Sequence, residues 1–216
     1  MNNFIKLKKI TKKYEKNNSL RVLNDISFSF EPGKTYSIMG PSGSGKSTLL
    51  NLLSLIDTPT AGSIEISNKK INSNNKNEND LIRAKKIGII YQDKNLLSDF
   101  TALENVYLPN LLISNEKKKS KELAKKLINN MGLSARLNHF PNELSGGENQ
   151  RIAIARALIN NPDIILADEP TGSLDSDNAE LIFKLLFNLK NNKRIIIFAT
   201  HNRYFADMAD CKIMMN

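Results

Sequence analysis

Apolar and polar residues alternate along two stretches near the start of the chain, residues 4–10 and 20–30. A period of two puts the apolar side chains on one face of an extended strand, so each stretch predicts a strand with one buried face. The sequence Glu31-Pro32-Gly33 follows the second stretch and predicts a turn. We expect the two strands to pair in an antiparallel sheet at the edge of the molecule.

Six further short runs, most of them apolar, predict strands. They cover residues 35–39, 63–67, 87–92, 163–168, 194–200 and the end of the chain near 211–215. Helices are predicted from Lys46 to about Ile56 and from Ser176 to Asn191, whereas the polar residues 67–80 predict a variable loop. Apolar strands that alternate with helices are typical of a mostly parallel sheet covered by helices on both faces. The predicted fold class is therefore α/β.

The pattern of apolar residues becomes helical between residues 96 and 160. Three segments carry it: TALENVYLPNLLI, KELAKKLINNMG and ENQRIAIARALI. No strong strand signal interrupts them, so residues 93–150 predict a helical subdomain inserted between core segments 1–92 and 151–216. At 216 residues the chain fits one such domain and is long enough to bury a core.

The composition narrows the class of protein further. No apolar run approaches the 18 residues that a membrane span needs, so we expect the chain to stay in the cytosol. The single cysteine, Cys211, excludes an internal disulfide and predicts a buried thiol. The net charge of +9 could favour nucleic acid or an anionic membrane surface. Because Lys and Asn are abundant along the whole chain and aromatic residues do not interleave with them, a solvated basic surface explains it better.

A glycine-rich loop, GPSGSGKST, lies between the predicted strand 35–39 and the predicted helix at Lys46. Glycine allows positive φ and close approach, so successive N–H groups can converge on phosphate oxygens, and the helix adds its positive end. In this pattern Lys46 reaches the β and γ phosphates and the Ser47 hydroxyl binds Mg²⁺. The predicted phosphate-binding residues are Gly40, Pro41, Ser42, Gly43, Ser44, Gly45, Lys46, Ser47 and Thr48.

Two acids, Asp168 and Glu169, follow the apolar run IILA at the carboxyl end of a predicted strand, the edge where such sheets bind ligands. Asp168 is expected to hold Mg²⁺ through a water, and Glu169 to polarise the attacking water as a general base. His201 and Gln92 follow strands that end at the same edge. His201 could bond a γ phosphate or orient Glu169, and Gln92 could reach metal or water.

Each of these residue types alone has a plainer explanation: two acids can begin a loop, and a lone histidine is more often structural. Their shared edge and the nearby glycine loop favour a catalytic site. The predicted catalytic residues are Glu169, His201, Gln92 and Lys46, and the predicted metal ligands are Ser47, Gln92 and Asp168.

The sequence LSGGENQ places Ser145, Gly146 and Gly147 before the predicted helix that starts at Glu148. A hydroxyl, bare amides and a helix N-terminus together can bind a second anion. Because one loop already wraps the phosphates, the second site is most useful if it closes over the nucleotide of another copy. This predicts a head-to-tail pair with two nucleotides between the subunits. A glycine-rich helix cap without a ligand is the alternative.

With these motifs in this order, the chain resembles the ATP-binding subunits of ABC transporters over nearly its whole length. The resemblance implies a P-loop NTPase fold of the ABC type, ATP and Mg²⁺ as ligands, and a head-to-tail dimer in which Ser145, Gly146 and Gly147 meet the partner's γ phosphate. It places Asp175 at the seam between the subunits. It also suggests that Tyr14 stacks on adenine, although a core or surface tyrosine is an equal alternative.

The finer resemblance is to the group that includes lipoprotein-releasing (LolD), macrolide-export (MacB) and cell-division (FtsE) ATPases. It is carried by MGPSGSGKSTLLNLLSLIDTPTAGSI, IGIIYQDKNLLSDFTALENVYLP and LADEPTGSLDS. Lipoprotein release is favoured because no membrane part is fused to this short chain. Three residues depart from the usual pattern, Asn149, Ser98 and Asn202, and none of them is a predicted phosphate, metal or base group.

This resemblance implies integral membrane permease subunits as partners, with the chain peripheral on the cytoplasmic side of the inner membrane. An ATPase that signals from the membrane, as in cell division, stays open. A soluble ABC ATPase acting on DNA or the ribosome is the rival of another class, and the chain lacks the coiled coils, zinc modules or second ATPase half usual there. A P-loop kinase or GTPase would leave LSGGENQ unexplained.

Overall fold

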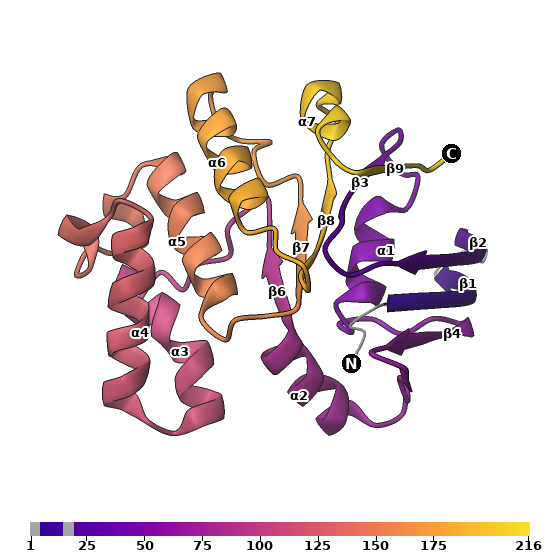
Figure 1. Cartoon of the computed structure of the whole chain (residues 1–216), viewed down its shortest axis with the longest axis horizontal. Coiled ribbons are helices and arrows are strands. Elements are labelled where there is room, and N and C mark those ends of the chain that lie inside the picture. Colours follow the sequence, from indigo (N-terminus) through magenta and orange to yellow (C-terminus); the bar gives the residue numbers. More distant parts are fainter. Residues whose placement is uncertain (1–4, 15–19) are drawn as a thin grey trace.

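The computed structural model describes residues 5–14 and 20–216, and its strands form two sheets (Figure 1). The antiparallel sheet has the order β2-β1-β4-β5 and the parallel sheet the order β6-β7-β8-β3-β9. The strands are β1 (Ile5–Tyr14), β2 (Leu20–Phe30), β3 (Thr35–Met39), β4 (Ala61–Ile66), β5 (Lys69–Lys70), β6 (Ile87–Ile90), β7 (Ile164–Asp168), β8 (Ile195–Ala199) and β9 (Cys211–Met214). Both predicted sheets, and with them the α/β class, are confirmed.

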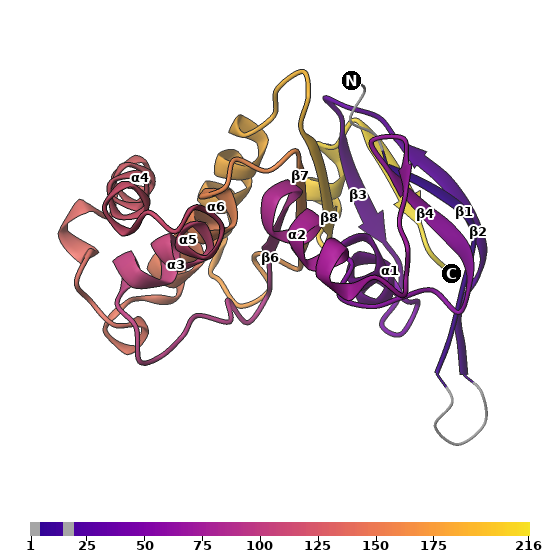
Figure 2. The ribbon, with the colours of Figure 1, turned by 90° about the horizontal axis from the view of Figure 1, so that it is seen from below.

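The helices lie on both faces of the parallel sheet, with the first of them between this sheet and the antiparallel one (Figure 2). They are α1 (Lys46–Leu53), α2 (Lys76–Lys86), α3 (Ala102–Ser114), α4 (Lys117–Asn130), α5 (Gly146–Leu158), α6 (Ser176–Asn188) and α7 (Arg203–Asp207), with short 3-10 turns at Ser134–Arg136 and Pro141–Glu143. Figure 2 shows α3, α4 and α5 at one end and the antiparallel sheet at the other, with β7, β8 and β3 between them. Within the described ranges, no helix has both the length and the apolarity to cross a membrane.

The parallel sheet separates two hydrophobic cores because successive side chains of a strand point to opposite faces. In β7, Ile164 and Leu166 pack with α1 and the antiparallel sheet, whereas Ile165 and Ala167 pack with α5, α6 and their neighbours. All four are buried. Covering the sheet on both faces is what its nearly continuous apolar strands predict.

The helix α5 connects the helical end to the sheet, since it packs against α3 and α4 on one side and against β6 and α6 on the other. It runs without a break from Gly146 to Leu158. The predicted limit of the helical subdomain at residue 150 therefore falls inside this helix. The division into a core and a helical subdomain of about residues 93–150 stays a prediction.

The prediction of a loop over residues 67–80 is wrong in part, because this segment contains β5 and the start of α2. The Asn75 side chain caps α2 by accepting a hydrogen bond from Glu78 N at 3.2 Å, and basic residues occupy the last turn. Asn79 is the one residue of this helix that is buried. Because α2 has no buried apolar face, its sequence shows no helical repeat of apolar residues. The Asn75 cap and the charged residues at its ends favour the helix instead.

Two helix ends also differ from the prediction. The helix α1 stops at Leu53 rather than near Ile56, since Leu55 adopts a left-handed conformation with φ of 60°. The helix α6 ends at Asn188 rather than Asn191. The short α7 was not predicted; Asn202 caps it by accepting from Tyr204 N at 2.9 Å.

Candidate nucleotide site

The glycine loop between β3 and α1 has a conformation that requires glycine at several positions. The φ angles are 156° at Gly40, 85° at Gly43 and 92° at Gly45. A Cβ atom at Gly40 would lie 2.3 Å from the Met215 carbonyl oxygen, and one at Gly45 would lie 2.8 Å from a methyl group of Leu23. The loop thus folds tightly against its surroundings, while Gly43 has open space beside it, as a binding loop needs.

The start of α1 is left without a capping side chain. Its N-cap is Gly45, no side chain accepts a bond there, and the first turn contains no acid. Lys46 is buried, and its ammonium group donates to the carbonyl oxygens of Gly40 at 2.9 Å and Pro41 at 3.0 Å. Because an ammonium group has three donors, one donor remains for a ligand beyond these two bonds. This end of α1 is therefore suited to an anion.

A cavity of about 460 Å³ brings most of the predicted site residues together. It is lined by Tyr14, Val22, Ser42, Gly43, Gly45, Lys46, Ser47, Thr48, Gln92, Asp168, Glu169 and His201. Gly40, Pro41 and Ser44 belong to the same loop but do not line the cavity. The residues after β3, β6, β7 and β8 meet here because parallel neighbours present their carboxyl ends at one edge.

The two acids at this edge each have a buried oxygen, Asp168 Oδ1 and Glu169 Oε1, without a hydrogen-bond partner among the described residues. Glu169 has a left-handed backbone, with φ of 45°, and its N–H donates to Ala199 O at 3.1 Å. His201 Nε2 lies 3.1 Å from Glu169 Oε1, and the His201 N–H donates to Glu169 Oε2 at 3.3 Å. The structure thus brings His201 to Glu169, as the sequence led us to expect.

Gln92 lies beside the segment that follows Glu169. A Cβ atom at Gly172 would be only 3.0 Å from Gln92 Nε2, so glycine at this position leaves room for the amide. Gln92 lines the cavity together with Asp168 and Glu169. It can therefore reach a ligand held between the loop and the two acids.

Tyr14 belongs neither to the core nor to an isolated part of the surface. Its side chain is 40% exposed and lines the cavity. The hydroxyl donates to Asp57 Oδ2 at 2.9 Å, and Lys12 Nζ lies 4.8 Å from the ring centroid. The position suits an aromatic platform for a base, which stays a prediction.

Ser145, Gly146 and Gly147 lie outside the cavity. Ser145 caps α5 in a capping box: its hydroxyl accepts from Glu148 N at 3.2 Å, and its N–H donates to Glu148 Oε2 at 2.8 Å. Gly146 is exposed, whereas Gly147 is buried and a Cβ atom there would lie 2.5 Å from Asn178 Oδ1. The two candidate anion sites of one chain are thus separate.

Asp175 also lies outside the cavity and serves as the N-cap of α6. Its carboxylate accepts from Asn178 N at 3.0 Å and from Asn178 Nδ2 at 2.7 Å. The hydrogen bond from the Asn178 N–H is the largest cause that lowers the pKa of this exposed carboxyl group. Its predicted place at a subunit seam stays a prediction.

Sequence reasoning missed the residues that hold the segment after Gln92. Arg156 of α5 donates to the carbonyl oxygens of Lys94 and Asn95, each at 2.6 Å, and both residues have positive φ. Gln150 of α5 is buried and donates to Tyr91 O at 3.4 Å. Polar residues inside the otherwise apolar stretch of α5 were the available signal. Through these bonds α5 is connected to both sides of Gln92.

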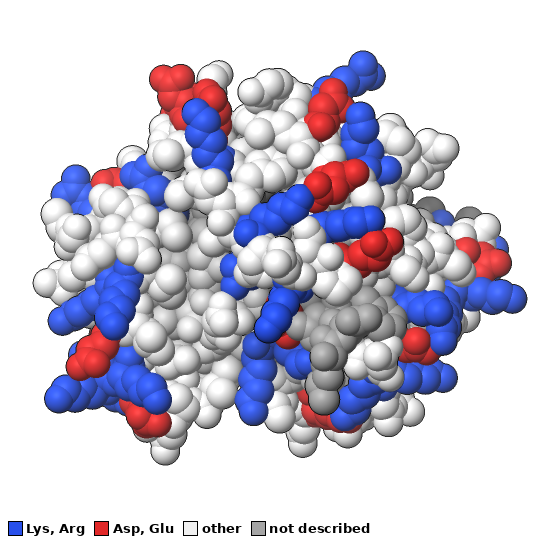
Figure 3. Space-filling model, viewed as in Figure 1, with Lys and Arg blue, Asp and Glu red and all other residues white. Residues whose placement is uncertain are grey.

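The basic charge does not gather at this site alone. On the face shown in Figure 3, Lys and Arg side chains extend from one edge of the molecule to the other with acidic side chains among them. Several lysines are paired, among them Lys190 with Asp210 at 2.7 Å and Lys184 with Glu180 at 2.8 Å. This distribution favours a solvated basic surface.

Comparison with known proteins agrees with this geometry. A model of the family described as ABC transporter matches residues 23–172. The chain is 44% identical over 211 residues to the lipoprotein-releasing system ATP-binding protein LolD of Rickettsia bellii, with 97% of this chain and 93% of that protein covered. It is 46% identical over 214 residues to the protein of that name in Wigglesworthia glossinidia brevipalpis, with the same two coverages of 97% and 93%.

Among solved structures, the ATP-binding cassette MJ0796, a dimer in a post-hydrolysis state bound to ADP and Pi, matches with a TM-score of 0.91. The two chains are 40% identical, and the match covers 98% of this chain and 94% of that one. The cavity between the glycine loop and the two acids, called the P-loop cavity from here on, and these similarities over nearly the full length lead to one conclusion. The chain belongs to the ABC transporter family.

Proposed function

We propose that this chain is the ATP-hydrolysing subunit of a membrane transporter, and that this transporter is a lipoprotein-releasing system. The observation that carries the proposal is the cavity in which Lys46 and the glycine loop lie together with Asp168, Glu169 and His201. An anion-binding loop and a carboxylate base that share one cavity are the two parts that phosphoryl transfer to water requires.

The loop and α1 bind the phosphates of ATP through backbone N–H groups, the helix N-terminus and the Lys46 ammonium group. The site also fits Mg²⁺, since Asp168 Oδ1 is buried without a partner among the described residues and Ser47 and Gln92 line the same cavity. These three residues would hold the ion, which when bound neutralises charge on the β and γ phosphate oxygens.

Glu169 is the proposed general base. Its carboxylate lies at the strand end in the same cavity as the loop. It takes a proton from the attacking water as the water oxygen bonds to the γ phosphorus and the bond from that phosphorus to ADP breaks, which releases ADP and phosphate. His201, with Nε2 at 3.1 Å and its N–H at 3.3 Å from the two carboxylate oxygens, fixes the direction of that carboxylate. Gln92 completes the lining beside the proposed water.

Two copies of the chain act together. Ser145 and Gly146 are exposed and lie outside the cavity of their own chain, so they are available to the nucleotide of a second chain, and the buried Gly147 continues the same helix start. Asp175, at the N-terminus of α6, is proposed to lie at the seam. The dimeric state of the similar cassette MJ0796, solved with ADP and Pi, supports this arrangement.

The membrane partners are integral permease subunits, and the chain is proposed to bind them from the cytoplasmic side of the inner membrane. The names of relatives that are 44% and 46% identical over 97% of the chain support lipoprotein release rather than efflux or cell division. Closure of the ATP dimer and its reopening after hydrolysis would move the helical part against the permease.

Replacement of Glu169 by Gln tests the chemistry. The variant keeps the size of the side chain and one acceptor oxygen but loses the base, so ATP binding is expected to persist while turnover falls at least about a hundredfold. Binding is measured by calorimetry and turnover by phosphate release. The matched control is Glu31→Gln, at an exposed residue that follows β2, pairs with Lys34 and does not line the cavity. Undiminished hydrolysis by Glu169→Gln would remove this residue from the mechanism.

The same variant tests the transporter. Held closed with ATP and purified from membranes of its own cells, it should carry stoichiometric permease subunits, and lipoproteins bound to them would identify release. Permease subunits without lipoproteins would point to efflux or cell division instead. Recovery with DNA or ribosomes and no membrane protein contradicts the transporter proposal.

A further inference from the structure

Tyr14 is held at the P-loop cavity by Asp57, which lies far from it in the sequence, and by the nearby Lys12. Its hydroxyl donates to Asp57 Oδ2 at 2.9 Å. The Lys12 ammonium group donates to Asp57 Oδ1 at 2.6 Å and to Thr58 O at 2.9 Å, and it lies 4.8 Å from the centroid of the Tyr14 ring. The ring is therefore fixed at its hydroxyl end and covered by a cation on one face.

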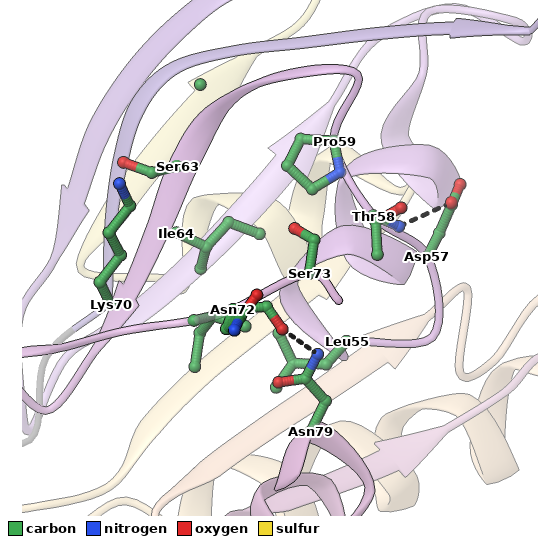
Figure 4. A pocket seen from close by; sticks show the side chains of 12 residues that line it. Leu55, Asp57, Thr58, Pro59, Ser63, Ile64, Lys70, Asn72, Ser73 and Asn79 are labelled. Carbon is green, nitrogen blue, oxygen red and sulfur yellow. Dashed lines mark hydrogen bonds between the residues drawn. The ribbon is translucent and has the colours of Figure 1, made fainter. Parts of the chain in front are cut away.

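Asp57 is itself fixed relative to the phosphate-binding helix. Its backbone N–H donates to Asn51 O at 3.2 Å, and Asn51 lies within α1, the helix that begins at Lys46. Figure 4 shows Asp57 at the edge of a second cavity of about 420 Å³, with its carboxylate bonded to Thr58 N at 2.7 Å. The carboxylate thus belongs to a short turn attached to α1, whereas Tyr14 belongs to β1.

The charge of Asp57 suits it to this position. Partial burial acts to raise the pKa of its carboxyl group, but hydrogen bonds from Lys12, Thr58 and Tyr14 outweigh burial and hold the pKa below its usual value. The carboxylate is therefore ionised at neutral pH and accepts strongly from the tyrosine hydroxyl. Lys12, which is only 9% exposed, balances the charge.

We infer that Asp57 is a positioning residue for nucleotide binding: it holds the Tyr14 ring at a fixed place relative to α1, so that adenine and phosphates are bound at the same time. The inference rests on the proposed function, in which ATP occupies the P-loop cavity. Lys12 covers one face of the ring, and the base stacks on the other. Asp57 itself does not touch the nucleotide.

The test compares ATP with inorganic tripolyphosphate, which has the phosphates but no base, both with Mg²⁺. Tyr14→Phe removes only the hydroxyl, and Asp57→Ala removes the carboxylate. Each change is expected to lower the affinity for ATP about threefold to tenfold, the range for one lost hydrogen bond. The affinity for tripolyphosphate should stay unchanged. In steady-state hydrolysis, KM rises and kcat does not.

Because Asp57→Ala and Tyr14→Phe break the same bond, the double variant should bind ATP no more weakly than Asp57→Ala alone. The matched control is Asp80→Ala, at an acid paired with Arg83 at 2.7 Å on α2. If Asp57→Ala does not fold, the affinities of Tyr14→Phe for ATP and for tripolyphosphate test the inference by themselves. The inference is overturned if Tyr14→Phe binds ATP as tightly as the wild type, or if the losses of ATP affinity in the two single variants add in full in the double variant. It is also overturned if the affinity for tripolyphosphate falls by the same factor as that for ATP. A wild-type chain that binds no ATP would overturn the proposed function as well.

Discussion

Two glycine-containing motifs of this chain, Gly40–Thr48 and Leu144–Gln150, each contain the start of a helix, and the two helices begin in opposite ways. The N-cap of α1 is Gly45, with no side-chain cap and no acid in the first turn. The N-cap of α5 is Ser145, which forms a capping box with Glu148, and Arg136 Nε donates to Glu148 Oε1 at 2.8 Å. One helix end is left for a ligand, and the other is largely satisfied by its own chain.

This difference explains how each loop can bind an anion. The first N–H groups of α1 have no capping side chain, so phosphates within the same chain can satisfy them. At α5 an acid already occupies the first turn, and only part of the helix end remains free. An additional anion is then favoured only when it is brought close and held by other contacts. A nucleotide carried by a second copy meets that condition.

The glycines differ for the same reason. Gly40 and Gly45 have positive φ and close neighbours, whereas Gly146 is a helical residue with only a methyl group of Leu174 at 3.6 Å from its Cβ position. Gly147 is needed for another purpose, the close approach of Asn178 on α6. The first loop thus needs glycine for its backbone conformation, whereas the second needs glycine at 147 for the close packing of α5 on α6.

Alanine at the two loops gives the largest expected contrast. Gly40→Ala places a Cβ atom 2.3 Å from the backbone oxygen of Met215. It should lower the free energy of unfolding by about 2–3 kcal/mol and the affinity for ATP more than tenfold. Gly146→Ala should leave the stability and the ATP affinity of a single chain within about 0.5 kcal/mol, and reduce only dimer-dependent hydrolysis. Denaturant unfolding and calorimetry measure both. Equal losses of stability would contradict the comparison.

The capping box of α5 predicts a pH dependence. Hydrogen bonds from Arg136 and Ser145 lower the pKa of Glu148 from 4.5 to about 2. Since the folded-state pKa lies below the unfolded one, this group stabilises the fold fully above about pH 4.5 and loses that effect as the pH falls toward 2. Glu148→Gln should therefore cost about 2 kcal/mol at pH 7 and progressively less below pH 4.5.

Thermal unfolding of wild type and Glu148→Gln between pH 7 and pH 3 measures this difference. The control is Glu180→Gln on α6, where an exposed pair with Lys184 should contribute almost nothing. A gap between the Glu148→Gln and wild-type midpoints that stays constant down to pH 3 would show that the carboxylate charge is not what stabilises α5.

The smallest expected effect belongs to Ser145→Ala. Loss of the N-cap should lower the free energy of unfolding by about 1 kcal/mol, because the Glu148 N–H loses its acceptor. ATP affinity of the isolated chain should not change, since Ser145 does not line its cavity. Reduced affinity in a monomer, checked by sedimentation, would mean that the two loops are not separate.

Local patterns were enough to determine much of this protein from its sequence. The alternation of β1 and β2, the apolar runs of the parallel strands and the sequence from Gly40 to Thr48 each identify their own element, because the relevant residues are neighbours in the chain. Asp168 and Glu169 could be placed at a ligand-binding edge because they directly follow an apolar run. The helix α2 was missed, since its caps and charges leave no apolar period.

Tertiary structure alone decided which of these elements meet. The strand order β6-β7-β8-β3-β9 brings Gln92, Glu169 and His201 to the glycine loop. The bond between Tyr14 and Asp57 joins residues 43 positions apart, and the fit of Gly147 against Asn178 depends on the packing of α5 on α6. Periodicity reports only how one segment buries its own face. Contacts between distant segments depend on the order and packing of whole elements, which no local pattern contains.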